Sequence, residues 1–167
     1  MKLLKLITAL CLIGVTCLAQ NTEKKPNDLK FYKLTLALKE MEAGKILGSR
    51  TYNLGIGSNS PLSNASIRTG DRVPTIAGKD GQFNYVDVGI NIDIRFWSTL
   101  GDELTLQITG DVSSLVEKSG GGPPVVNQTK WSTTVAVQFN KPTTVFTSDG
   151  ASTKRQLQLE ITATPVQ

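Results

Sequence analysis

Hydrophobic and polar residues alternate along much of the chain after residue 29, and a period of two is typical of strands that bury one face. The clearest case is the segment 86–97, whose apolar positions are Val86, Val88, Ile90, Ile92, Ile94 and Phe96. No stretch after residue 29 keeps a helical period. The pattern predicts an all-β chain.

Seven further segments carry shorter alternations, and stretches rich in Gly, Asn, Asp and Pro separate them. We expect these strands at residues 32–39, 52–56, 67–73, 104–112, 131–139, 145–146 and 157–163. Pro74 is expected to end the strand at 67–73, and Ala43-Gly44 to turn an N-terminal hairpin at 29–56. About eight mostly antiparallel strands predict a β-sandwich or a partly open barrel.

The first 19 residues have the pattern of a secretory signal peptide. Lys2 and Lys5 precede an apolar run at residues 6–18, and Ala19 precedes a polar stretch. The run is shorter than the roughly 20 apolar residues of a membrane span. We therefore expect cleavage after Ala19, a flexible polar leader at 20–28, a single β domain at 29–167, and no transmembrane span after signal removal.

Both cysteines, Cys11 and Cys17, would leave with this signal, so the mature domain would carry no disulfide. Lys2 and Lys5 would leave too, and 16 basic residues would then face 14 acidic ones. An alternative is a lipoprotein acylated at Cys17, although Thr16 stands where a Gly, Ala or Ser would favour that processing. The remaining basic residues are scattered, which does not indicate nucleic-acid binding.

The chain contains no histidine, which excludes Ser/His/Asp and Cys/His catalysis and every His-ligated metal site. The acidic candidates for a calcium or acid–base site are Asp87, Asp93, Asp102, Glu103 and Asp111. They lack the Asp-x-Asp-x-Asp-Gly spacing of a calcium loop, and the glycines at 120–122 lack the ending of a phosphate loop. We predict no catalytic, metal-binding or cofactor-binding residue.

Several short segments follow one another in the order seen in a known family. They are residues 64–74 (NASIRTGDRVP), 85–90 (YVDVGI), 104–108 (LTLQI), 111–114 (DVSS), 123–126 (PPVV), 133–137 (TTVAV) and 157–165. Residues 64–167 thereby resemble the C-terminal core domain of bacterial secretins, the outer-membrane channel subunits of type II and III secretion and type IV pilus systems. The chain is similar to a short secretin-like protein without the family's ring-forming N-domains.

Two departures from the family limit what the resemblance implies. Only the hairpin at 29–56 precedes the core, and residues 140–155 stand where the family carries a glycine-rich segment with a Pro-Ile-Leu-Gly-like motif. The resemblance therefore implies a shared β core and an envelope location, and it does not imply a pore.

Four residues are candidate partner contacts. Trp97 has the opposite parity to Phe96, which predicts an exposed aromatic side chain of a kind enriched at interfaces. Arg68, Asp71 and Arg72 are polar residues of the family-like segment beside Pro74. A salt-bridged edge turn is the simpler interpretation of these three. Trp131 shares the parity of Val135 and Val137, which predicts a place in the core.

Together these patterns predict an exported, non-enzymatic component of the cell envelope, in the periplasm, at the outer membrane or outside the cell. Its partner would be an envelope protein or a second copy, bound through a strand edge. One alternative is an exported small-ligand or carbohydrate-binding module that uses Trp97. Another is a carboxylate-based hydrolase, because paired acids suffice for glycoside hydrolysis.

Overall fold

A computed structural model describes residues 29–59, 61–77, 82–116, 125–149 and 155–166, with the backbone alone at 75–77 and 82. The predicted signal peptide at 1–19, the leader at 20–28 and the glycines at 120–122 lie outside the described residues. The described part contains strands joined by turns, bends and short irregular segments, and it contains no helix.

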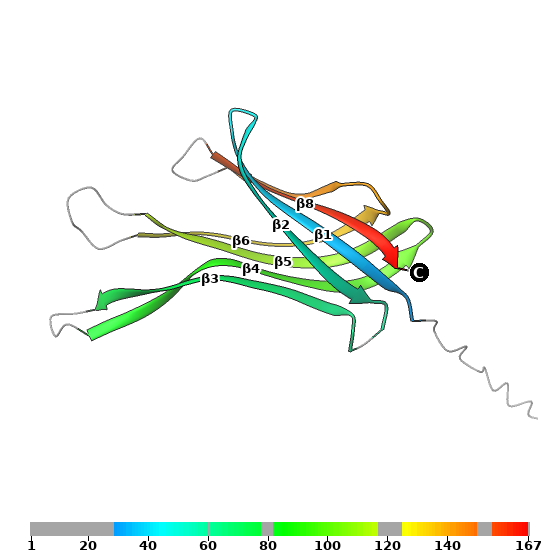
Figure 1. Cartoon of the computed structure of the whole chain (residues 1–167), viewed down its shortest axis with the longest axis horizontal. Helices are drawn as coiled ribbons and strands as arrows, with labels where there is room; N and C mark the ends of the chain where they lie inside the picture. The colour runs from blue at the N-terminus through cyan, green and yellow to red at the C-terminus, as the bar shows by residue number, and fades with distance from the viewer. Residues whose placement is uncertain (1–28, 60, 78–81, 117–124, 150–154, 167) are drawn as a thin grey trace, which may run out of the picture.

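Eight strands form two four-stranded antiparallel sheets (Figure 1), which confirms the all-β sandwich. Sheet A has the order β2-β1-β8-β7 and sheet B the order β3-β4-β5-β6. The strands are β1 (Phe31–Glu42), β2 (Lys45–Gly57), β3 (Asn64–Ala77), β4 (Gln82–Leu100), β5 (Glu103–Val116), β6 (Val125–Gln138), β7 (Thr143–Asp149) and β8 (Arg155–Val166).

The inner faces of the two sheets make one hydrophobic core, because the alternating apolar residues of each strand point toward the opposite sheet. The fully buried side chains are Leu34, Leu36, Ile56, Ile92, Ile94, Leu104, Leu106, Ile108, Val137, Leu159 and Ile161. The ring of Tyr32 stacks on Phe96 and Phe139, and its hydroxyl lies 2.9 Å from the hydroxyl of Thr99. The predicted core face of the segment 86–97 is thus confirmed at residues 90–96.

The chain changes sheets after β6. The N–H of Phe139 donates to the carbonyl oxygen of Asp102 beside sheet B, and the next N–H, that of Asn140, donates to the carbonyl oxygen of Ala163 in sheet A. Asn140 has a φ of 61°, a left-handed conformation that Asn adopts more readily than most residues. Residues 139–140 are therefore where the chain crosses between the layers.

Pro74 does not end β3, so the strand boundary predicted there was wrong. β3 continues through Pro74 to Ala77 because it is one of the two edge strands of sheet B. Phe96 donates its N–H to Ser63, one position before the pair Asn64–Arg95, so in β3 the odd positions exchange hydrogen bonds with β4. Pro74 is an even position whose missing N–H would face the open edge, and the strand loses no ladder bond.

Trp131 is half-buried and packs against the core, on the inward side that its parity predicts. Its ring stacks on Phe146 with ring centroids 4.1 Å apart and covers Gly110 on the neighbouring strand β5. A Cβ atom at Gly110 would collide with the six-membered ring of Trp131. Gly110 therefore leaves the space in which this aromatic pair packs.

Gly110→Ala should destabilise the domain by about 1–3 kcal/mol, because the added methyl group overpacks the space under Trp131. Gly48→Ala is the matched control, since a Cβ there meets nothing within 4 Å, and it should be neutral or slightly stabilising. Urea denaturation of the two variants measures the difference. Equal stabilities would contradict this account of the Trp131 packing.

Candidate functional site

Strand β6 is an edge strand of sheet B. It pairs with β5 on one side and has no strand neighbour on the other within the described residues. Phe139 donates its N–H toward the β5 side, and the β5–β6 register has no shift. In an antiparallel pair such residues alternate, so the odd positions of β6 bond to β5 and the even positions direct their N–H groups to the open edge. Those even positions include Gln128, Lys130, Ser132, Thr134 and Ala136.

This β6 edge carries few of the features that keep strand edges from pairing. It is 14 residues long, has no proline and carries one charged residue, Lys130. Long, uncharged edges are ready templates for a further strand. The opposite edge, β3, is also 14 residues long and contains Pro74 and three charged residues, Arg68, Asp71 and Arg72.

Sheet B forks where β4 and β5 stop pairing, beyond the pair Ile90–Val112. Past this point β4 pairs only with β3, and β5 only with β6, so two hairpins diverge on the side away from the C-terminus (Figure 1). At the fork the hydroxyl of Ser113 accepts a hydrogen bond from the N–H of Gly89 at 3.0 Å and lies 3.5 Å from its carbonyl oxygen. The Ser113 side chain thus replaces a backbone rung between the two strands.

Gly89 and Gly70 face each other across β3 and β4 beside this fork. A Cβ atom on either residue would overlap the backbone of the opposite strand, and Gly89 has a φ of 153°. Only glycine at both positions allows this approach. Gly89 interrupts the polar face of the segment 86–97, and this close backbone approach is the reason.

A cavity of about 550 Å³ lies between the sheets next to the fork, with Leu38, Ile90 and Val112 in its lining. The inner face of sheet A becomes polar here, and Arg155 forms an ion pair with Glu40 at 2.9 Å. The two sheets therefore part at this end because charged residues replace the apolar inner positions.

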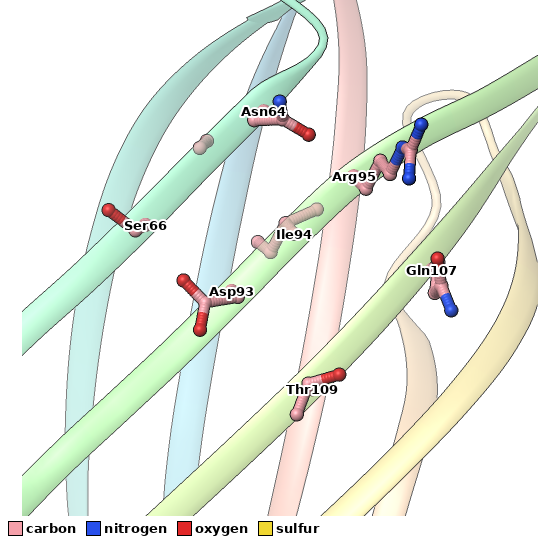
Figure 2. Close-up of a pocket in the computed structure, with 8 residues that line it drawn as sticks. Asn64, Ser66, Asp93, Ile94, Arg95, Gln107 and Thr109 are labelled. Atoms are coloured by element: carbon pink, nitrogen blue, oxygen red, sulfur yellow. The ribbon is translucent and has the colours of Figure 1, made fainter.

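A shallower hollow of about 420 Å³ lies on the outer face of sheet B, the face turned away from sheet A. Figure 2 shows two rows of polar side chains that cross β3, β4 and β5 there, and the strand register aligns them. One row is Asn64, Arg95 and Gln107, and the other is Ser66, Asp93 and Thr109.

The predicted contact residues do not form one cluster. Arg68 pairs with Asp93 at 2.6 Å and Arg72 with Asp87 at 3.3 Å, both on the outer face of sheet B, while Asp71 has the opposite parity. The guanidinium of Arg72 also lies 5.6 Å from the ring centroid of Tyr85. The strand register places Trp97 near the other end of β4.

The five acidic candidates do not converge either. Asp111 accepts hydrogen bonds from Gln128 and pairs with Lys130 at 3.6 Å, and Glu103 accepts from Gln138 at 3.4 Å. Asp87 and Asp93 are held by arginines, and Asp102 lies in the β4–β5 turn. No group of three metal-ligating side chains occurs within the described segments.

Two features of sheet B were not predicted from the sequence. Nothing in the sequence distinguishes Ser113 from other serines, because its hydrogen bond with Gly89 depends on where β4 and β5 separate. The row of Asn64, Arg95 and Gln107 depends on the register of three strands. The one available signal was parity, because Arg95 and Trp97 share the outward positions of β4.

No protein-family model matches the chain, and no curated protein matches it. Among solved structures, the secretin InvG of the Salmonella SPI-1 type III secretion injectisome aligns at a TM-score of 0.50 and 10% identity over 83% of this chain and 64% of that chain. The likeness shows a secretin-like fold, as the motifs at 64–167 predicted.

Two type II secretion structures align less closely. One, from the Klebsiella pneumoniae outer membrane complex of PulD, PulS and the PulC HR domain, has a TM-score of 0.45 and 13% identity over 83% of this chain and 38% of that chain. The other, the enteropathogenic Escherichia coli secretin GspD, has a TM-score of 0.48 and 11% identity over 83% and 66%. The chain spans less than two thirds of each of these secretin chains.

The part of the chain that the structure describes contains no helix long and apolar enough to cross a membrane.

Ser113→Ala should cost about 1 kcal/mol, because it leaves the N–H of Gly89 without its partner. Amide hydrogen exchange at Gly89 should then be roughly fivefold faster. The neighbouring exposed Ser114 provides the control variant, Ser114→Ala, which should leave that rate unchanged. The same Gly89 rate in both variants would show that Ser113 does not close the fork.

Proposed function

We propose that this chain is an exported structural component of the bacterial cell envelope, which acts through protein–protein contact and without catalysis. Two observations support the location: the signal-peptide pattern of residues 1–19 and the secretin-like fold. The mature domain would then work in the periplasm or at the outer membrane.

The observation that carries the contact role is the open edge of β6. Its even-numbered N–H groups point away from β5, and Lys130 is its one charged residue. A partner strand would gain main-chain hydrogen bonds along about 14 residues, which is the mode of binding by strand addition. The neutral Val- and Thr-rich sequence favours such pairing.

A second copy of this chain is the partner that fits the edge best. Sheet B has four antiparallel strands, so β3 of a second copy placed beside β6 would continue the antiparallel alternation. β3 and β6 are both 14 residues long, and both direct even-numbered N–H groups outward. This contact is head-to-tail. Repeating it produces a closed ring when the rotation between neighbouring copies brings the last copy back to the first.

Sheet A would follow the same arrangement. Its edge strand β2 contacts β3, and its other edge strand β7 contacts β6. On each side of the sandwich, one edge of sheet A therefore lies beside one edge of sheet B. One head-to-tail contact could therefore join both sheets of neighbouring copies. The area involved would then exceed that of a single added strand.

The first test concerns export. Expression in a Gram-negative host should yield a mature protein that begins at Gln20 with no added lipid, because Ala19 meets the small-residue requirement at the cleavage site. Intact-mass measurement of the envelope fraction checks this. A protein that keeps residues 1–19 in the cytoplasm, or one acylated at Cys17, would contradict the proposed processing.

The second test concerns the β6 edge. Thr134→Pro removes an N–H group that points outward and leaves the bonds to β5 in place, so the domain should fold but assemble poorly. Thr134→Ala removes the same side chain and keeps the N–H, so it should assemble like the parent chain. Light scattering over a concentration series gives the masses, and circular dichroism verifies folding.

A strictly monomeric parent chain at every concentration would overturn assembly by a second copy. Assembly of Thr134→Pro equal to that of Thr134→Ala would overturn the role of this edge.

A further inference from the structure

Trp97 is the extra residue of a β-bulge in β4. The register with β5 passes from Phe96–Leu106 directly to Ser98–Thr105, so Trp97 has no opposite residue. Phe96 and Thr99 lie on the core side, where both contact Tyr32. Trp97 is 64% exposed and therefore projects from the outer face of sheet B.

The row of Asn64, Arg95 and Gln107 crosses the same outer face of sheet B (Figure 2). Trp97 follows Arg95 by two strand positions, which separates them by about 7 Å along β4. Within the described residues, none of the three side chains of this row makes a hydrogen bond or ion pair. The row therefore presents amide and guanidinium groups that are ready to bind an external molecule.

The charge of this hollow is asymmetric. Asp93, the acidic residue of its second row, is already neutralised by Arg68 at 2.6 Å. Arg95 has no such partner among the described residues. The hollow thus offers one cation without an ion pair beside neutral hydrogen-bonding groups. The exposed ring of Trp97 stands outside its lining, two positions beyond Arg95 along β4.

We propose that the outer face of sheet B beside Trp97 binds an acidic oligosaccharide. A sugar ring has an apolar C–H face that packs on an indole, and its hydroxyl groups both donate to and accept from side-chain amides. Asn64 and Gln107 supply such amides, and the guanidinium of Arg95 matches a sugar carboxylate in a bidentate way. This site is separate from the β6 edge on which the proposed assembly depends.

The probe is tetragalacturonate, with neutral cellotetraose as its comparison. Titration of the full chain, followed through the indole N–H signals by NMR, should shift the signal of exposed Trp97 and leave that of core-packed Trp131 in place. Trp97→Ala should weaken tetragalacturonate binding about tenfold or more. Tyr85→Ala, at an aromatic residue 59% exposed on the same face, should leave it unchanged.

Arg95→Gln separates recognition of the carboxylate from recognition of the sugar ring. It should weaken tetragalacturonate binding about tenfold and leave cellotetraose binding unchanged, because only the acidic sugar uses the guanidinium. No binding of tetragalacturonate by the parent chain, or equal binding by Trp97→Ala, would overturn the proposal. Equal affinity for a DNA oligonucleotide would also overturn it, because that result would show general polyanion binding.

Binding of the saccharide should be independent of the proposed assembly through the β6 edge. Thr134→Pro should bind tetragalacturonate as the parent chain does, so a failure of the saccharide site and a failure of the β6 edge are observed separately.

Discussion

The burial of one face of each sheet against the other is the interaction on which the remaining features of this domain depend. Leu34, Leu36 and Ile161 of sheet A are fully buried in one core with the isoleucines and leucines of β4 and β5. Fully burying such a side chain stabilises the fold by about 1.5–3 kcal/mol. The described residues contain no cysteine that could form a disulfide. Because the core uses only the inner faces, the outer face of sheet B and the open edges are left for contacts.

The same core explains why the molecule opens at one end. Its fully buried apolar positions stop at Leu38 in β1 and Ile90 in β4, and Glu40 and Arg155 of sheet A face the space between the sheets at that end. Sheet B loses its β4–β5 pairing at this level, where the hydroxyl of Ser113 bonds to Gly89. The end of the core and the fork in sheet B therefore coincide.

Parity along the sequence predicted much of this arrangement, because burial of a strand face repeats every two residues. It placed Trp131 inside and Trp97 outside, as found. It could not predict that β1 pairs with β8, since a local pattern does not identify a distant neighbour. For the same reason it could not predict that β3 is an edge strand, and the edge position is what allows Pro74 within it. The row of Asn64, Arg95 and Gln107 could not be predicted either, because it depends on the register of three strands.

We propose that the open edge of β6 receives a strand from a second copy. Amide hydrogen exchange along β6, measured at increasing protein concentration, tests it residue by residue. The outward N–H groups of Lys130, Ser132 and Thr134 should exchange fast in dilute solution and become protected at high protein concentration, while the N–H groups that face β5 should stay protected throughout. Outward groups that exchange equally fast at every concentration would contradict it.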